Sequence, residues 1–441
     1  MLTTSRRRHC IALLLLAGCE TAPAVDAGAD VAVLDTAGLD TAGLDAPGLD
    51  APGLDAPGTD APAMPRDAPR RDAGPAMASP RLVALAPGEV LDMGPIDCES
   101  PVGDEGGCRA VTDFGGMAYD PIGHRMLVWG GGHAGTMTDS IQALDLSGEL
   151  DWRDLYSPSP CSIMTEANLD RGLGAWRSGA SGPYPRPATA HSYDLLGYAP
   201  VEDEFVVLGR AFTDGAGDCG LADNAIGGPT AHYSDSLGSW EFGEDASSTL
   251  STDLAGTERD PVSGDFVVLG SDGLRIYDPA SRTIVHRTDV LRRADGEWVG
   301  DMDVTFHYAN HLVYYPPTDR FYYFVRSGAA ASGVLEIVPD RADWSRTTVA
   351  LLTTTGSMSP HEEPGYDYDA QYEVIRGGVS DGVLYTFDPR ARSWRSSVIP
   401  GIAEVSQAYH ALGYDPVSEV FIFRGYSLSG GYRTYAYRPA D

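Results

Sequence analysis

The sequence predicts an all-β fold, a β-propeller of four-stranded blades, on two observations. A motif close to Tyr-Asp-Pro recurs along the chain, and each copy is followed by a short apolar run bounded by Gly, Pro or Asp. From residue 198 onward the copies lie roughly 46 to 61 residues apart, near the ~40–50 residues of a propeller blade. One blade cannot bury both faces of its small sheet, so we expect the blades to stack around an axis.

The first residue of each motif is the anchor of its repeat. The anchors are Tyr119, Tyr198, Arg259, Tyr315, Tyr368 and Tyr414. The runs after them are rich in Val, Ile, Phe, Tyr and Leu, which is typical of strands, and they predict six blades. The longer interval between the first two anchors is either an insertion or a seventh blade. The last repeat stops one strand short, and residues 81–92 have the pattern to supply that strand and close the ring.

Residues 1–19 predict a targeting segment. Three arginines precede an apolar stretch at residues 10–17, which is too short to cross a bilayer because a spanning helix needs ~20 residues. The stretch leads into Leu-Ala-Gly-Cys19, which resembles a bacterial lipoprotein signal whose cysteine is lipidated; an ordinary secretory signal is the alternative. Glu20 follows, and by this resemblance it favours delivery to the outer membrane. We expect an exported protein held to the cell envelope by its lipid alone.

Residues 20–79 predict a disordered tether, and residues 80–441 the propeller. A pentad of the form Leu-Asp-(Thr/Ala)-(Ala/Pro)-Gly repeats through residues 34–58. One aliphatic residue in five cannot form a core, and Pro, Gly and Asp keep the backbone extended and solvated. We therefore expect the tether to hold the folded domain away from the membrane.

The chain is strongly acidic. Its formal net charge is −32, and every fixed positive charge is an arginine because the sequence contains no lysine. Nucleic-acid affinity depends on cationic side chains that neutralise phosphates, so we expect no nucleic-acid partner. A high net charge is typical of a soluble exported protein, which we expect to be a monomer.

Four cysteines remain once the two in the targeting segment are set aside. They are Cys98, Cys108, Cys161 and Cys219. An even number in an exported chain predicts two disulfides. Three pairings are possible, and we favour Cys98–Cys108, which closes a short loop, with Cys161–Cys219. The spacing of these cysteines suits no zinc site.

Two positions of the repeat predict a ligand-facing mouth. They lie seven and five residues before the anchors, share strand parity, and are polar or aromatic where a structural inner strand would carry small apolar residues. Pore packing with ordered water is the alternative. Seven before the anchors stand Thr112, His191, Thr252, Tyr308, His361 and Gln407. Five before them stand Phe114, Tyr193, Leu254, Asn310, Glu363 and Tyr409.

Arginine recurs at the end of the second strand in four repeats. These residues are Arg210, Arg326, Arg376 and Arg424. The planar guanidinium group suits bidentate binding of a carboxylate or sulfate. Four of them at equivalent positions in an acidic chain predict a focused positive site for an anionic ligand. Ion pairing with neighbouring Asp or Glu along the blade edges is the alternative.

Three glycines at 130–132 follow the second expected strand of the first repeat, and Leu-Asp-Leu at 144–146 closes the third. This order resembles the kelch and galactose-oxidase-like propellers, and it implies their architecture for the folded domain. The copper site of galactose oxidase needs two His, two Tyr and a Cys. The cysteines of this chain lie mostly outside the inner strands, so we expect no such site here.

Other metal sites are weakly indicated, and we expect no cofactor apart from a structural calcium ion. Asp301 and Asp303 are the candidate calcium ligands, and two solvated loop acids are the alternative. His307, His311 and His410 are candidates to join a metal site. Strand parity turns His311 and His410 away from the mouth positions, which favours a core or inter-blade role for both.

His133 follows the three glycines, and Tyr193 and Arg210 lie on the next repeat. This trio is similar to the sites of propeller-type polysaccharide lyases that act on uronate-containing polymers, such as the ulvan lyases. The resemblance implies that Arg210 neutralises the uronate carboxylate and acidifies the proton at C5. It also implies that His133 and Tyr193 are the base and acid, with His191 as a supporting group.

The sequence leaves three functions open. The first is a lipid-anchored propeller that recognises an anionic polysaccharide or a surface protein through its funnel, without chemistry. The second is a polysaccharide lyase that cleaves uronate-containing polymers by β-elimination. The third is a structural hub for interactions in the cell envelope. We find no Walker-type glycine loop and no HExxH motif in the sequence.

Overall fold

The computed structural model describes residues 77–95, 115–130, 138–210, 219, 228–246, 255–270, 273–289, 292–293, 310–325, 333–361, 364–427 and 431–440. The chain divides into two compact units, Met1–Pro69 and Arg70–Asp441, and all described residues belong to the second. The predicted lipidation site Cys19 thus lies outside the described residues. In the described part, no helix is long and apolar enough to cross a membrane. Helical structure there comprises α1 (Pro80–Val83), η4 (Pro316–Thr318) and η5 (Trp344–Arg346).

Six sheets of four or five strands follow one another in the described chain, and we number them blades 1 to 6. Blade 1 contains β2 (Ala118–Asp120), β3 (Arg125–Trp129), β4 (Ile141–Asp145) and β5 (Trp152–Asp154). Blade 2 contains β9 (Leu196–Ala199), β10 (Glu204–Val207), β11 (Ala231–Ser234) and β12 (Ser239–Phe242). Blade 3 contains β13 (Gly256–Arg259), β14 (Phe266–Gly270), β15 (Gly273–Asp278) and β16 (Thr283–Thr288).

The second half of the chain repeats this pattern. Blade 4 contains β18 (His311–Tyr315), β19 (Arg320–Val325), β20 (Gly333–Val338) and β21 (Thr348–Leu351), with β17 (Arg292–Arg293) parallel to β21. Blade 5 contains β22 (Tyr366–Asp369), β23 (Val374–Ser380), β24 (Val383–Asp388) and β25 (Ser393–Val398). Blade 6 contains β26 (Val405–Asp415), β27 (Val420–Ser427), β28 (Gly431–Tyr437) and β1 (Val90–Pro95).

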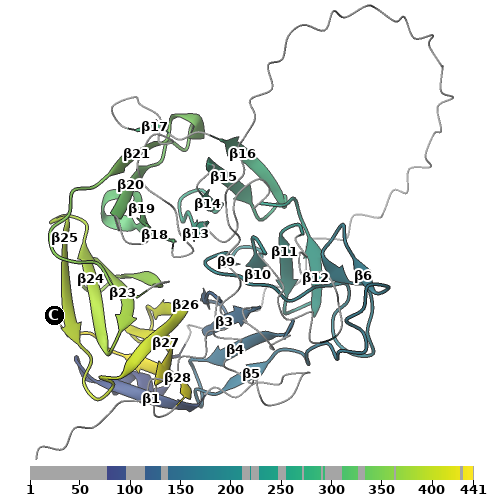
Figure 1. The fold of residues 1–441 in the computed structure, drawn as a ribbon, viewed down its shortest axis with the longest axis horizontal. Helices are drawn as coiled ribbons and strands as arrows, with labels where there is room; N and C mark the ends of the chain where they lie inside the picture. Colours follow the sequence, from purple (N-terminus) through teal and green to yellow (C-terminus); the bar gives the residue numbers. More distant parts are fainter. Residues whose placement is uncertain are drawn as a thin grey trace, which may run out of the picture. The chain divides into compact units, whose positions relative to one another are not determined.

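The six blades stand around a common centre (Figure 1). The first strand of each blade is innermost, and these strands contact one another in a closed cycle in which β26 touches β2. Antiparallel sheets repeated radially around an axis form a β-propeller. The predicted all-β propeller is therefore confirmed, while the number of blades in the complete protein stays a prediction.

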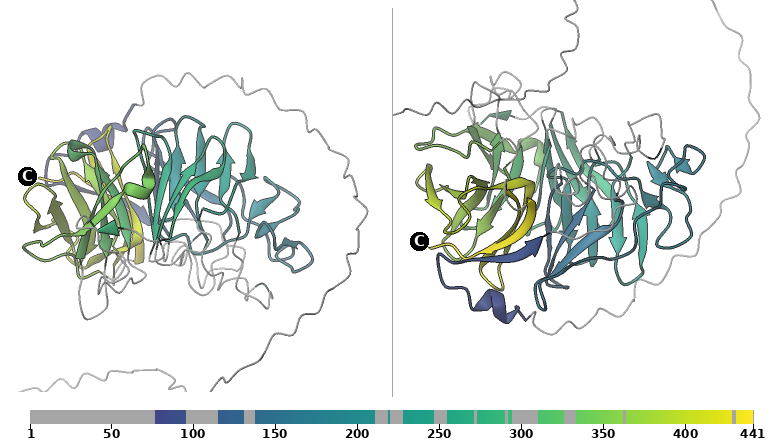
Figure 2. Two further views of the ribbon diagram at one scale, coloured as in Figure 1. Left: turned by 90° about the horizontal axis from the view of Figure 1, so that it is seen from above. Right: turned by 60° about the horizontal axis from the view of Figure 1, so that its bottom comes forward.

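Blade 6 is completed by a strand from the other end of the domain. β1 pairs antiparallel with β28, from Val90 opposite Tyr437 to Pro95 opposite Arg433. The two strands lie side by side in Figure 2, which confirms that an N-terminal strand closes the ring. The start of the segment expected to form this strand instead forms α1, because Pro80 suits the first turn of a helix and has no N–H for a sheet.

Between blades 1 and 2 the described chain makes an insertion that lies outside the ring. It carries a small sheet of β6 (Leu169–Asp170), β7 (Ala175–Trp176) and β8 (Arg186–Pro187). The inner strands β2 and β9 contact each other directly, and β8 contacts the outer strand β12. The Cys161–Cys219 disulfide ties the insertion to the β10–β11 connection and confirms one expected pairing. The other pairing, Cys98–Cys108, lies outside the described residues.

Each blade buries apolar side chains on both faces of its sheet. In β14, Phe266 and Val268 pack toward blade 2, whereas Val267 and Leu269 pack toward blade 4. Among the described residues, six such clusters each lie between two neighbouring blades. Burial stabilises by about 25 cal/mol per Å² of apolar surface, so these shared clusters hold the blades together.

The aspartate of the repeated motif explains why the motif recurs. In blade 1, Asp120 Oδ1 accepts hydrogen bonds at 2.8 Å from the N–H groups of Ile122 and Gly123, and Oδ2 pairs with Arg125 at 2.7 Å. The first two bonds close the β2–β3 turn, and the ion pair neutralises the buried carboxylate. Three equivalent aspartates also bind a cation: Asp260 with Arg341, Asp369 with Arg376, and Asp415 with His124.

The ring closure can be tested on α1. Leu82 packs between blades 6 and 1 with 0% exposure, whereas the adjacent Val83 is 57% exposed. Leu82→Ala should lower the free energy of unfolding by about 2–5 kcal/mol because it leaves a cavity. Val83→Ala should change it by less than about 0.5 kcal/mol. Urea unfolding measures both values, and equally small effects would show that α1 does not belong to the folded core.

Candidate functional site

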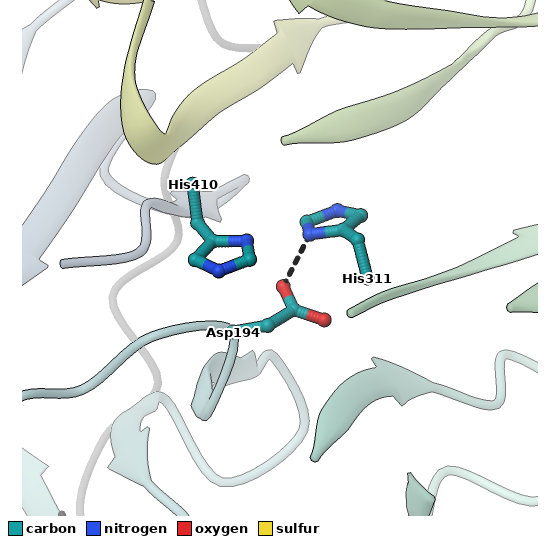
Figure 3. A group of neighbouring side chains, drawn as sticks. All are labelled: Asp194, His311 and His410. Atoms are coloured by element: carbon teal, nitrogen blue, oxygen red, sulfur yellow. Dashed lines mark ion pairs between the residues drawn. The ribbon is translucent and has the colours of Figure 1, made fainter. Parts of the chain in front are cut away.

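One position of the repeat builds the site. Four residues before the anchors of blades 2, 4 and 6 stand Asp194, His311 and His410, which we call the axial triad. The same position in blades 1, 3 and 5 holds Gly115, Ala255 and Pro364. Because the inner strands converge, the three side chains of the triad meet although they lie far apart in the sequence (Figure 3).

The donor atoms of the axial triad lie close together. Asp194 Oδ1 is 2.7 Å from His311 Nδ1, and Figure 3 shows the carboxylate pointing toward both imidazole rings. The rings of His311 and His410 are nearly parallel, at 12°, with 5.7 Å between their centroids. One donor atom from each residue lies within 4.8 Å of the others, and all three residues are buried. Among the described residues this is the one group of three or more His, Cys, Asp or Glu side chains arranged so closely.

A tight turn before β9 directs Asp194 to the axis. Tyr193 has a φ of 42°, a left-handed conformation that is uncommon for a residue with a side chain. The N–H of Leu195 donates to the carbonyl oxygen of Ser192 at 2.8 Å and closes the turn. The Tyr193 carbonyl approaches Gly116 so closely that a Cβ there would lie 2.3 Å from its oxygen. Glycine at 116 therefore permits the turn that positions the carboxylate.

Backbone hydrogen bonds fix the orientation of the Asp194 carboxylate. Its Oδ2 accepts from the N–H of Thr257 in blade 3 at 3.0 Å and from the N–H of Leu312 in blade 4 at 3.1 Å. Its Oδ1 faces His311. The carboxylate thus links three blades and is held in one direction, as supporting hydrogen bonds do for a ligand in a metal or proton-sharing site.

Buried negative charge gathers near the axial triad. Burial raises the pKa of Asp194, and burial together with repulsion from Asp367 raises the pKa of Glu258 well above its usual value. Burial also raises the pKa of Asp367 to about 6. Burial opposes protonation of His311, but the Asp194 carboxylate outweighs it, so the His311 pKa is raised. This environment favours a cation on the axis, whether a proton or a metal ion.

One predicted mouth residue, Tyr193, adjoins the axial triad, and a second, His191, contacts Tyr193. The Tyr193 ring meets the His410 ring edge to face at 6.3 Å, and Tyr193 Oη lies 3.3 Å from His191 Nδ1. Strand parity counted from the anchors places His410 on the opposite face from His191 and Tyr193. In the structure, however, the rings of His410 and Tyr193 are in contact. Tyr193 lies in a turn, and β26 has a register shift between Gln407 and Leu412. Side chains do not alternate regularly across such irregularities.

Further predicted mouth residues lie at the start of the inner strands of blades 4 to 6. The half-buried His361 places Nε2 2.5 Å from the backbone oxygen of Gln407, whose Oε1 accepts from the N–H of Val379 at 3.2 Å. Asn310 is buried and hydrogen-bonds to Tyr323. His133, Tyr308, Arg326, Glu363 and the side chain of Tyr409 lie outside what the structure describes.

The three described arginines of the predicted anionic site are buried and hydrogen-bonded within the protein. Arg210 donates to three backbone carbonyl oxygens, and burial lowers its pKa to about 10. Arg376 pairs with Asp369 at 2.7 Å. Arg424 donates to Gln142 Oε1 at 2.7 Å. Each of the three guanidinium groups thus has at least one partner inside the protein, and a role in ligand binding stays a prediction.

Sequence reasoning missed Asp194, although a signal was present. The position four before the anchor carries an acid or a histidine in alternate repeats and a glycine, alanine or proline in the others. This alternation is expected where side chains from three blades share the space at the axis and the other three must leave room. Comparing all positions of the repeat, instead of the two with mouth parity, would have found the axial triad.

A cavity of about 600 Å³ lies away from the axial triad, between the turns of blades 1 and 2. Its lining includes Arg125 and two acids that pair with it, Asp120 at 2.7 Å and Asp235 at 3.1 Å. It contains none of the predicted site residues. Because these charges are already paired, the cavity gives no indication of a ligand.

Comparisons with known proteins find only distant structural likenesses. No family model and no curated protein match the sequence. An auxiliary nutrient binding protein from Bacteroides thetaiotaomicron VPI-5482 aligns with a TM-score of 0.44 at 11% identity, over 79% of this chain and 76% of that one. The WD40 β-propeller domain of Doa1 gives 0.35 at 11% identity, over 73% and 77%. YjhT gives 0.42 at 10%, over 73% and 93%. These likenesses are too distant to indicate a ligand, and kelch or galactose-oxidase kinship stays a prediction.

The raised pKa of Asp367 predicts a pH-dependent stability. Its pKa in the folded protein, about 6, lies above the usual aspartate value of 3.8, so its contribution to stability is fully present below pH 3.8 and is lost as the pH rises through 6. Asp367→Asn keeps an acceptor for the Tyr414 N–H and cannot ionise. As the pH rises from 4 to 7.5, the free energy of unfolding of the variant should increase relative to that of wild type by up to about 2 kcal/mol. Urea unfolding across this range, with the exposed Asp151→Asn as control, tests it; parallel curves would contradict the assignment.

Proposed function

We propose that the protein is an exported, lipid-anchored β-propeller that recognises a glycan at the mouth of its central channel. The observation that carries the proposal is the convergence of polar and aromatic side chains at the starts of inner strands. Tyr193 of blade 2 adjoins the axial triad and contacts His191, and His361 contacts Gln407 at the boundary of blades 5 and 6. Binding sites typically combine aromatic surfaces with a few placed polar groups of this kind.

Two features support the exported location. The Cys161–Cys219 disulfide suits an oxidising compartment. The signal-like segment that ends at Cys19, followed by a Pro-, Gly- and Asp-rich tether, suits a domain displayed at a distance from a membrane. A surface-displayed binding domain with a long reach fits capture of a polymeric ligand.

The charge of the glycan is left open by this proposal. The preference for an anionic polysaccharide rested on four arginines, of which Arg210, Arg376 and Arg424 are bonded inside the protein. The described residues thus give no support for an acidic over a neutral glycan. Both classes belong in the test, together with surface proteins as the alternative partner.

Glycan binding can be tested by substituting two half-exposed histidines, one at the mouth and one on an outer strand. A glycan array that contains neutral and uronate-containing polysaccharides should retain the protein, and calorimetry then measures the affinity for the best ligand. His361→Ala, at the mouth, should weaken binding by about 5- to 10-fold, the equivalent of one hydrogen bond. His286→Ala, on the outer strand β16, should leave it unchanged. Failure to bind any glycan, or an equal effect of both substitutions, would refute the proposal.

A lyase is a second candidate, favoured by one observation. Tyr193 Oη lies 3.3 Å from His191 Nδ1, and the strained backbone of Tyr193 is of the kind that clusters at active sites. In this version one of Tyr193 and His191 would remove the proton at C5 of the uronate, and the other would protonate the leaving glycosidic oxygen as the C4–O bond breaks. Arg210, whose donors are bound to carbonyl oxygens, would not be the neutralising group.

The lyase candidate predicts an ultraviolet absorbance rise from the unsaturated product with ulvan, alginate, pectate or a glycosaminoglycan. Tyr193→Phe should lower the rate by at least about 100-fold, since acid–base catalysis contributes 10²–10⁴-fold. Tyr198→Phe, whose hydroxyl bonds Asp203 near the β9–β10 turn, should leave the rate unchanged. A flat trace with every polymer excludes the lyase and leaves glycan recognition standing.

A further inference from the structure

The axial triad has the composition of a transition-metal site. Two imidazole nitrogens and one carboxylate oxygen are the donors that zinc takes in catalytic sites, and they also form the facial triad of non-haem iron. Calcium prefers a shell of six to eight oxygen atoms, so the two histidines argue against it. The donor set thus fits a divalent transition-metal ion with open coordination positions.

The distances allow one ion to reach all three residues. Bonds of about 2.0–2.2 Å place two ligands of a tetrahedral ion about 3.3 Å apart. Asp194 Oδ1 and His311 Nδ1 lie 2.7 Å apart, and all three donor atoms lie within 4.8 Å of one another. Side-chain shifts of about 1 Å would bring the three donor atoms around a common metal centre. The metal would replace the proton that the Asp194–His311 pair shares.

Backbone hydrogen bonds from neighbouring blades orient the Asp194 carboxylate. The N–H groups of Thr257 and Leu312 engage Asp194 Oδ2 and leave Oδ1 facing the imidazole of His311. Such supporting bonds orient the ligands of metal sites. The acids Asp367 and Glu258 interact electrostatically with Asp194, and burial raises the pKa of both. A divalent cation would relieve the mutual repulsion of these carboxylates.

Other buried histidines of the described chain have simpler environments. His232 places Nδ1 2.9 Å from Glu204 and Nε2 2.7 Å from Tyr277, and a single imidazole completes that network. A purely structural partner for Asp194 would likewise need one histidine. The axial triad instead directs a second imidazole, from a third blade, toward the same carboxylate.

We propose that Asp194, His311 and His410 together bind one divalent transition-metal ion on the axis of the propeller. Its ligands come from blades 2, 4 and 6, so the ion joins alternate blades of the ring. This inference goes beyond glycan recognition and does not depend on it, because metal binding is measured without any glycan.

The test uses the full chain purified without a histidine tag, stripped with a chelator and titrated with Zn²⁺ by calorimetry. Mass spectrometry of the dialysed protein gives the metal content. We expect about one Zn²⁺ per chain. His311→Ala and His410→Ala should each weaken binding by more than about 100-fold, beyond the 10- to 100-fold typical of supporting groups. His232→Ala removes a buried histidine that pairs with Glu204. This variant should still bind about one Zn²⁺ per chain.

A second measurement guards against variants that fail to fold. Zn²⁺ should raise the Tm of wild type and of His232→Ala, because a ligand that binds only the folded state stabilises it. It should not raise the Tm of Asp194→Asn or His410→Gln, which keep hydrogen-bonding groups in place. The proposal is overturned if the wild-type chain binds no stoichiometric Zn²⁺. It is equally overturned if binding survives all the triad substitutions, because the ion would then lie elsewhere.

Discussion

Each of the six blades is apolar on both faces of its sheet, and this constraint determines most of the architecture. A blade with two apolar faces needs a neighbour on each side, so the row of blades must bend round until the first meets the last. Closure then forces the innermost strands together at the centre. As a result, residues as distant as Asp194 and His410 become neighbours, and a single repeat position delivers side chains from three blades to one point.

The fold was predictable because its signals are local. The aspartate of the repeated motif bonds within its own turn, as Asp120 does with the N–H groups of Ile122 and Gly123, so the pattern must recur wherever the turn recurs. The missing strand of the last repeat was equally visible, and β1 supplies it. The helical start of that segment was not foreseen, because Pro80, which directly precedes it, was not weighed against the strand pattern.

The site was only partly predictable, because it depends on departures from regular strand geometry. His191 and Tyr193 were found through strand parity; Tyr193 adjoins the axial triad, and His191 contacts Tyr193. Parity failed for His410, which lies within the register shift of β26 between Gln407 and Leu412. The repeated arginines stay a prediction as a ligand site, because repetition also serves turns: Arg376 pairs with the motif aspartate of its own blade. Repetition alone does not tell a ligand site from a structural one.

The pairing of β1 with β28 has a consequence for biogenesis. One partner is synthesised at the start of the domain and the other at its end, so the nascent chain carries an open strand edge while all the intervening residues emerge. Such an edge is a template for misassociation. A chain that ends before β28 lacks the strand that pairs with β1. The ring can therefore close in this way only after the whole domain has been synthesised.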